Sequence, residues 1–212
     1  MRKPGERQYL TPSEIYRRSY AIIEENLGHI DGPADERLVR VRIAHASADT
    51  EFAKSFIFHP GAVEAGVSAL KRGANIVTDV GMVEAGIRSR LPEAYGGKLS
   101  CFLYGDETAA AAKRDGTTKS AAALAGAIDV FRGGIVAIGN APTALFELVD
   151  LVEEGRARPA LVVGVPVGFV GAAESKRELA RLDLPFITNP DRRGGSSLAA
   201  AIVNGLLHLA FE

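Results

Sequence analysis

Short apolar runs alternate with stretches of helical spacing along most of the chain. The apolar runs predict strands, because they are brief, rich in Val and Ile, and bounded by Gly, Pro or Asn. They cover Leu38–Ala46, Ala74–Val80, Lys98–Tyr104, Gly134–Ile138, Ala160–Val167 and Pro185–Thr188. Helices are predicted between them and at both ends, over residues 12–26, Pro60–Arg72, Gly81–Arg90, Thr118–Phe131, Pro142–Glu154, Ala172–Leu182 and Ser196–Ala210.

Two of these predictions rest on specific local signals. Thr11–Glu14 reads T-P-S-E, a capping box with Pro at the first helical position, so a helix begins there. Leu38–Ala46 alternates residue by residue, which puts Arg40 and Arg42 on one face of a strand and His45 near its end.

The alternation of strands and helices predicts parallel βαβ units with right-handed connections. No Pro- or Ser-rich linker interrupts it, so we expect one domain over residues 1–212, with 1–9 forming a flexible arm. The predicted fold class is α/β: a three-layer α/β/α arrangement of the flavodoxin-like kind with a doubly wound, mainly parallel sheet.

Composition excludes several classes of protein. The 212 residues carry 25 Lys and Arg against 26 Asp and Glu, and 47% of them are hydrophobic. That apolar content is too high for a disordered chain, and a dedicated nucleic-acid binder would show a basic excess. The single Cys cannot form an internal disulfide. There is no signal peptide or membrane-length apolar run, so we expect a cytoplasmic protein without nucleic-acid or membrane partners.

In an open α/β sheet, ligands bind beyond the carboxyl ends of the strands. Three Gly- or Pro-marked turns follow predicted strands there: Gly139–Ala144, Gly168–Lys176 and Asn189–Ser197. Each opens a helix, whose free N–H groups and positive dipole end suit an anion. The alternative is that such turns need glycine for steric reasons, whatever they bind. The sequence has neither a P-loop nor a G-x-G-x-x-G motif after a strand, so it gives little support to a nucleotide-dependent enzyme.

His45 is the main candidate for proton transfer. At a strand end it would lie at the ligand edge, where an imidazole can donate or accept a proton near neutral pH; the alternative is a hydrogen-bonded structural His. Ser19 lies on the helix face that should pack inward, where it either bonds a backbone carbonyl or points at a ligand. Arg40 and Arg42 require carboxylate partners from protein or ligand. No His or Cys spacing suggests a metal site.

Five stretches of the sequence together resemble one known family. They are Ile15–Tyr20 (IYRRSY), Arg42–Ala46 (RIAHA), Ala137–Leu145 (AIGNAPTAL), Val165–Lys176 (VPVGFVGAAESK) and Arg193–Ser196 (RGGS). In this order, and over about residues 12–207, they resemble the precorrin-8X methylmutase family of cobalamin biosynthesis. The GNAPTAL and VPVGFVGAAESK stretches are highly specific. The segment Ala46–Phe52 is more similar to the cobalt-precorrin-8 branch, which acts on the metallated substrate.

The resemblance implies a flavodoxin-like fold, a homodimer with its site near the subunit interface, and no external cofactor. It implies that a methyl group migrates from carbon 11 to carbon 12 of a corrin-type macrocycle, a 1,5-sigmatropic shift that yields cobyrinate or hydrogenobyrinate. The family's acid/base histidine falls on His45, and its substrate-contacting Ser and Arg fall on Ser19 and Arg42. Members commonly have Thr-Arg-Ser or Thr-Arg-Ala where this chain has Thr118-Lys119-Ser120, so Lys119 keeps the charge but loses the bidentate fork.

The implied substrate is a flat tetrapyrrole with acetate and propionate arms, which needs polar clamps and apolar walls. Candidate substrate-binding residues are Ser19, Arg42, Arg17, Lys119, Asn140, Thr143, Gly171, Arg193 and Gly194, with Arg192 as a further cation. Candidate apolar walls are Met82, Val83, Val167, Phe169 and Val170. We expect His45 to protonate the conjugated ring system and ease the methyl shift. A non-catalytic corrinoid carrier that passes product to the next enzyme is the alternative.

Overall fold

The structure, a computed structural model, describes residues 10–212; the arm predicted over 1–9 lies outside the described residues. The strands are β1 (Ile57–Phe58), β2 (Ile76–Thr78), β3 (Leu99–Cys101), β4 (Ile135–Ile138), β5 (Leu161–Gly164) and β6 (Phe186–Thr188). The helices are α1 (Pro12–Leu27), α2 (Ala34–Ser47), α3 (Thr50–Lys54), α4 (Ala62–Lys71), α5 (Gly81–Arg88), α6 (Asp106–Arg114), α7 (Lys119–Gly126), α8 (Pro142–Glu153), α9 (Ala172–Leu179) and α10 (Ser196–Phe211).

All the strands form one sheet in the order β1-β6-β5-β4-β2-β3. β2 to β6 run parallel, and β1 joins the outer edge antiparallel to β6. Numbered along the chain, the parallel strands have the spatial order 2-1-3-4-5 that is typical of flavodoxin-like folds. The predicted fold class is therefore confirmed, and its topological switch point lies between β2 and β4.

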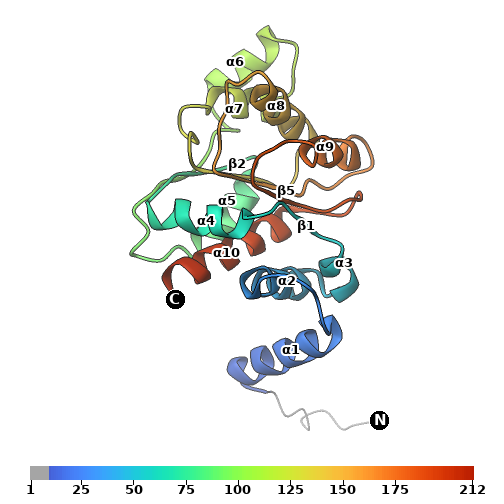
Figure 1. The fold of residues 1–212 in the computed structure, drawn as a ribbon. Helices are drawn as coiled ribbons and strands as arrows, with labels where there is room; N and C mark the ends of the chain where they lie inside the picture. The colour runs from blue at the N-terminus through green and yellow to red at the C-terminus, as the bar shows by residue number, and fades with distance from the viewer. Residues whose placement is uncertain (1–9) are drawn as a thin grey trace, which may run out of the picture.

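Helices cover both faces of the sheet, and each face buries its own apolar cluster (Figure 1). One cluster joins α7, α8 and α9 to the sheet, with Val77, Val136 and Val162 pointing toward it. The other joins α4, α5 and α10 to the opposite face, with Ile76, Ile135 and Leu161 pointing toward it. Successive strand residues alternate between the two clusters, because side chains alternate across a strand.

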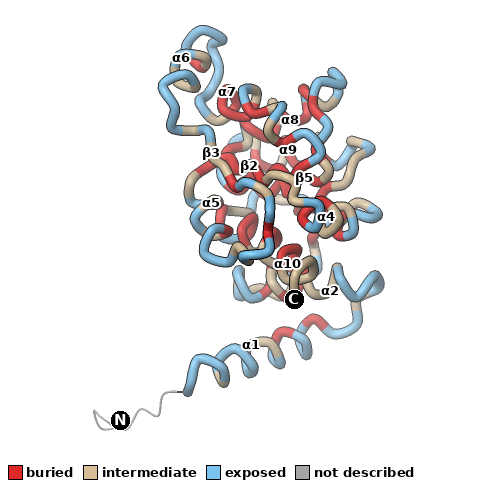
Figure 2. Tube along the Cα trace, turned by 90° about the vertical axis from the view of Figure 1, so that its left-hand side faces the viewer, coloured by how far each residue is buried: buried red, intermediate tan, exposed pale blue. Residues whose placement is uncertain are grey.

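The N-terminal helices add a further layer beneath α10, which the prediction of three layers does not contain (Figure 1). α2 packs on α10 and on α3, and α1 packs on the far side of α2. Figure 2 shows α1 extending from the body, with buried positions only in its second half. Those buried residues are Ile23 and Leu27, whereas Ile15 and Ile22 are exposed, so the expectation that Ser19 lies on an inward-packed face is only partly met.

The strand predicted at Leu38–Ala46 is wrong, because this segment is the body of helix α2. The helix is buried between α1 on one side and α10 on the other, so its apolar residues are not confined to one stripe. Val39, Val41 and Ile43 are all buried, and this spacing reads as a period of two. His45 therefore lies in the last turn of a helix and not at the carboxyl end of a strand.

Most other elements match their predictions within a few residues. The capping box at Thr11 is present, with both of its reciprocal hydrogen bonds to Glu14. The helix predicted over Thr118–Phe131 ends earlier, at Gly126. β1, α3 and α6 were not predicted: β1 has two residues, α3 has five, and α6 is mostly exposed. Assignment of the chain to one domain stays a prediction, favoured by the single sheet.

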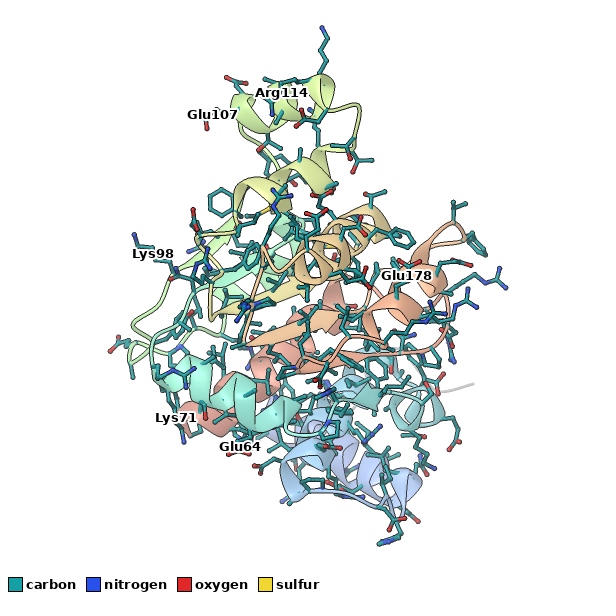
Figure 3. The ribbon with its side chains drawn as sticks, turned by 45° about the horizontal axis from the view of Figure 1, so that its top comes forward. Glu64, Lys71, Lys98, Glu107, Arg114 and Glu178 are labelled. Carbon is teal, nitrogen blue, oxygen red and sulfur yellow. The ribbon has the colours of Figure 1, made fainter. Side chains whose placement is uncertain are left out.

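Charged side chains of both signs share the same surface helices. Figure 3 shows Glu64 and Lys71 on α4, and Glu107 and Arg114 on α6. Each of these two helices therefore carries both charge signs on its surface. Within residues 10–212, no helix is long and apolar enough to cross a membrane.

Candidate functional site

His45 lies near the end of α2, in contact with two tyrosines from α1. The ring of Tyr20 stacks on the imidazole with centroids 5.5 Å apart, and the ring of Tyr16 does so at 5.7 Å. Tyr16 and Tyr20 are one helical turn apart, so both project from one face of α1. This packing orients the His45 ring, while the residue itself remains exposed.

Ser19, on the same helix as the tyrosines, shares a hollow with His45. The hollow has a volume of about 320 Å³ and lies between α1 and the end of α2. Its lining includes Ile22 and Asn26 from α1, and Ala48 from the turn after α2. Ala48 has φ of 54°, a left-handed conformation that ends α2 and turns the chain into α3. The structure thus brings Ser19 and His45 together. Ser19 lies on α1, which the sequence pattern predicted, and His45 lies on α2, which it did not.

Arg42 lies one turn before His45 and faces a second hollow, between α2 and α10. This hollow is about 160 Å³, and His45 borders it as well. The Arg42 guanidinium is 5.8 Å from the ring centroid of Tyr20. His45 therefore separates two hollows, one lined by Ser19 and the other by Arg42.

Arg40 does not share this environment, which corrects the expectation that Arg40 and Arg42 lie on one face. The Arg40 side chain is buried, and its Nη1 donates to the carbonyls of Ala53, Lys54 and Phe56. Its partners are thus main-chain carbonyls at the end of α3, not the carboxylates that the sequence led us to expect. Burial lowers the pKa of Arg40 from its ordinary value.

At the switch point, a carboxylate of the chain itself occupies the N-terminus of α8. Asp79 follows β2 and is buried; it accepts N–H groups from Gly139 at 3.1 Å, Asn140 at 2.8 Å and Ala141 at 2.7 Å. Burial raises the pKa of Asp79, and these hydrogen bonds oppose that shift. The sequence predicted that the Gly139–Ala144 turn offers free N–H groups to an anion, but those of Gly139, Asn140 and Ala141 already donate to Asp79.

The other turns at the carboxyl ends of the strands pack closely on one another. A Cβ on Gly139 would lie 2.8 Å from Ser196 Cα, and one on Gly194 would lie 2.2 Å from the Val165 carbonyl. Only glycine allows these approaches.

The Thr143 hydroxyl pairs with the Thr118 hydroxyl at 2.8 Å, which places Lys119, at the start of α7, beside the start of α8. Gly171, φ 79°, precedes α9. We call Lys119, Asn140, Thr143, Gly171, Arg193 and Gly194 the rim.

Arg193 connects this rim to the turn after α2. Its guanidinium pairs with Asp191 at 2.7 Å and with Asp49 at 3.1 Å, and lies 4.1 Å from the ring centroid of Phe52. Two carboxylates already neutralise this cation, so it is not a free anion clamp. The buried Lys176 ammonium donates to the Arg193 carbonyl at 2.7 Å and holds the same loop from beneath.

Several predicted contacts are not gathered with the histidine. Neither hollow that His45 borders is lined by a rim residue. Arg17 is exposed on α1 and lines neither hollow. Among the predicted apolar walls, Phe169 and Val170 are 88% and 89% exposed, but Val83 is fully buried and cannot face a ligand. No group of three or more His, Cys, Asp or Glu in the described part of the chain could hold a metal ion.

Sequence reasoning missed Tyr16, Tyr20, Asp79 and Lys176 as site residues. The two tyrosines carried a usable signal, because an aromatic pair at i and i+4 on a helix forms one surface. Asp79 carried a weaker sequence signal, because a lone Asp after a strand does not reveal that its hydrogen-bond partners are about sixty residues away. Lys176 was visible only as part of a family motif.

The comparisons with known proteins cover nearly the whole chain. Residues 14–209 match the family model of precorrin-8X methylmutase. The chain belongs to this family. It is 44% identical over 199 residues to cobalt-precorrin-8 methylmutase from Priestia megaterium, covering 94% of this chain and 88% of the relative. It is 46% identical over 197 residues to precorrin-8X methylmutase from Pseudomonas aeruginosa, covering 91% and 93%.

The solved structure of precorrin-8X methylmutase from Thermus thermophilus has the same fold. It superposes with a TM-score of 0.85 at 38% identity, covering 93% of this chain and 96% of that one. The predicted family and enzyme class are therefore confirmed: the chain is a methylmutase, an isomerase of cobalamin biosynthesis. The relatives bear both names, with and without cobalt, so the predicted branch stays a prediction.

Proposed function

We propose that this methylmutase moves a methyl group from carbon 11 to carbon 12 of precorrin-8 or its cobalt complex, with His45 as the acid/base group. The observation that carries the proposal is the position of His45 between two hollows, one lined by Ser19 and the other by Arg42. An exposed imidazole held by two tyrosine rings can meet a ring nitrogen of a flat ligand without first leaving a packed core.

The proposed step balances within the substrate. His45 protonates the conjugated system, the bond between carbon 11 and the methyl breaks as that to carbon 12 forms, and the double bonds shift. The proton then returns to His45, so the product is an isomer. No oxidant, reductant or second substrate enters the balance, and we therefore propose that no cofactor takes part. Ser19 and Arg42 would hold the macrocycle against His45.

We further propose that the substrate's carboxylate arms engage part of the rim. Lys119 at the start of α7, Gly171 before α9 and Gly194 before α10 remain the candidates, together with the side chains of Asn140 and Thr143. Arg193 would contribute mainly by fixing its loop, since Asp49 and Asp191 neutralise it. The exposed Phe169 and Val170 are suited to line one side of a flat ring.

A homodimer is part of the same proposal. Large apolar side chains are exposed on α1 and near the rim, among them Ile22 at 57% and Phe169 at 88%, and a second copy would cover some of this surface. Light scattering of the purified chain should give twice the monomer mass; a monomer at micromolar concentration would contradict this part. We also propose a cytoplasmic location and one domain, as the sequence predicts.

Turnover of purified precorrin-8 and cobalt-precorrin-8, followed by the absorption of the macrocycle, tests the proposal. We expect conversion by the wild type and a loss of about 10²- to 10⁴-fold in kcat for His45→Ala and His45→Gln. Wild-type rates in both variants would overturn the role of His45. Tight product binding with no methyl migration by the wild type would instead indicate a corrinoid carrier. The better of the two substrates identifies the branch.

A further inference from the structure

The hollow between α2 and α10 has the properties of a site for one carboxylate group. It is lined by Arg42 and His45 from α2, Arg90 and Pro92 from the segment after α5, and Asn204 and His208 from α10. Resting on the function proposed above, we propose that Arg42 and Arg90 clamp a single carboxylate arm of the substrate in this hollow. Arg90 is the new element, since neither its position nor the motifs of the sequence had marked it.

Size decides that the hollow takes an arm and not the ring. Pockets that enclose a drug-sized ligand have volumes of about 300–1,000 Å³. This hollow has about 160 Å³, which is too little for a tetrapyrrole but enough for an acetate or propionate group. Because His45 borders the hollow, a macrocycle placed against His45 would have an arm within reach of it.

The two arginines that line the hollow indicate that the group bound there is anionic. In residues 10–212, neither Arg42 nor Arg90 lies within ion-pair distance of an acidic side chain. Two guanidinium groups lining one hollow repel each other, and a carboxylate between them removes that repulsion. Guanidinium groups also match the planar geometry of a carboxylate with paired hydrogen bonds.

Two other polar side chains of the hollow have partners within the protein. Asn204 Nδ2 donates to the Gly86 carbonyl at 3.1 Å, while the buried Asn204 Oδ1, an acceptor, has no hydrogen-bond partner among the described residues. His208 pairs with Glu212 at 2.5 Å. Glu212 is the one acidic residue among those that line the hollow, and His208 holds it. The two arginines are therefore the free charged donors among the described lining residues.

The test is steady-state turnover by Arg90→Gln, using the substrate that the wild type converts. An arm contact made equally in the ground and transition states lowers KM without raising kcat. We expect KM to rise about ten- to hundredfold with kcat within about twofold, and Arg90→Lys to fall between the variant and the wild type. Arg132→Gln removes a positive charge from the loop before β4 and should match the wild type. An unchanged KM, or a fall in kcat alone, overturns the proposal.

A double variant tests whether both arginines hold the same arm. If they do, Arg42→Gln and Arg90→Gln together raise KM by clearly less than the product of their separate effects. Multiplicative effects would overturn the shared clamp.

A binding measurement gives a second test. Cobyrinate, titrated by its visible absorption, should bind the wild type more tightly than its fully methyl-esterified form does, and Arg90→Gln should reduce the ratio of these two affinities. Failure of the wild type to convert any precorrin-8 would instead refute the proposed function, and an altered molecular mass of Arg90→Gln would overturn the assignment in favour of an interface role.

Discussion

The Asp79 carboxylate and the Ala141 N–H group meet at 2.7 Å across the switch point of the sheet. The N–H groups of Gly139, Asn140 and Ala141 together form a three-donor cradle for the buried Asp79 side chain. In flavodoxin-like folds this crevice is where a ligand is expected. Here the Asp79 side chain already accepts these N–H groups, so substrate recognition must use other groups.

Replacing Asp79 with Ala should therefore destabilise the protein. Three N–H groups lose their acceptor in a place that water reaches poorly, and we expect a loss of roughly 3 kcal/mol in the free energy of unfolding. Urea denaturation measures this loss. Added formate should restore part of the stability of Asp79→Ala, because a small anion can enter the cradle, and it should not do so for Asp79→Asn, whose side chain fills the space. Equal formate responses in both variants would contradict this account.

The parallel sheet could be predicted from the sequence because its strands are buried on both faces. Gly134–Ile138 and Ala160–Val167 are brief apolar runs bounded by turn residues, which few other elements produce. Helix α2 could not be predicted in this way, because it is buried between α1 and α10 and lacks the single apolar stripe that identifies a surface helix. The wrong prediction placed His45 at the end of a strand, whereas it lies in the last turn of a helix.

The candidate site was predicted in part for a related reason. The residue pattern singled out His45, Ser19 and Arg42, and the resemblance to a family gave them roles; the structure places all three around two hollows that His45 borders. Most of the rim was inferred from glycine-marked turns, with Lys119 added by the family resemblance, and a turn pattern does not say which N–H groups the chain itself uses. Asp79 accepts three N–H groups of the Gly139–Ala144 turn, and only the folded arrangement of β2 beside β4 reveals it.

Tyr20 should matter for turnover through the orientation of its neighbours. Its ring stacks on His45 and lies beneath the guanidinium of Arg42. Tyr20→Ala leaves both groups without this support, and we expect kcat/KM to fall about tenfold to a hundredfold, while Tyr20→Phe keeps the ring and stays within about threefold. Tyr16→Ala, at the more exposed of the two tyrosines, serves as the matched comparison and should cost less. If Tyr20→Phe is as impaired as Tyr20→Ala, the hydroxyl and not the ring is what counts.

Arg40 should be a stability residue and not a substrate contact. Its buried guanidinium bonds the carbonyls of Ala53, Lys54 and Phe56 and lies 4.5 Å from the ring centroid of Phe58. Arg40→Met leaves those carbonyls without donors, and we expect the free energy of unfolding to fall by about 3 kcal/mol in urea titrations. The KM of the folded variant at low temperature should remain near the wild-type value. A large rise in KM with unchanged stability would show that Arg40 contacts substrate.

Lys176 should make stability depend on pH above neutrality. Burial lowers the pKa of its ammonium to about 8 from the ordinary 10.5, although it donates to Asn189 Oδ1 at 3.1 Å and to the Arg193 carbonyl at 2.7 Å. Between these two values the unfolded chain binds the proton that the folded chain has released, so the stability contribution of Lys176 rises with pH. Below about pH 8 both states are protonated, and the contribution is at its least favourable.

The comparison of wild type with Lys176→Met isolates this effect, because other titrating groups cancel in the difference. We expect the wild-type free energy of unfolding, minus that of Lys176→Met, to increase by about 3 kcal/mol between pH 7.5 and 10.5. Lys71→Met, at the exposed end of α4, removes a surface lysine and serves as the matched control over the same range. Parallel pH profiles for wild type and Lys176→Met would mean that the Lys176 ammonium keeps an ordinary pKa in the folded protein, and that its two hydrogen bonds offset the cost of burying its charge.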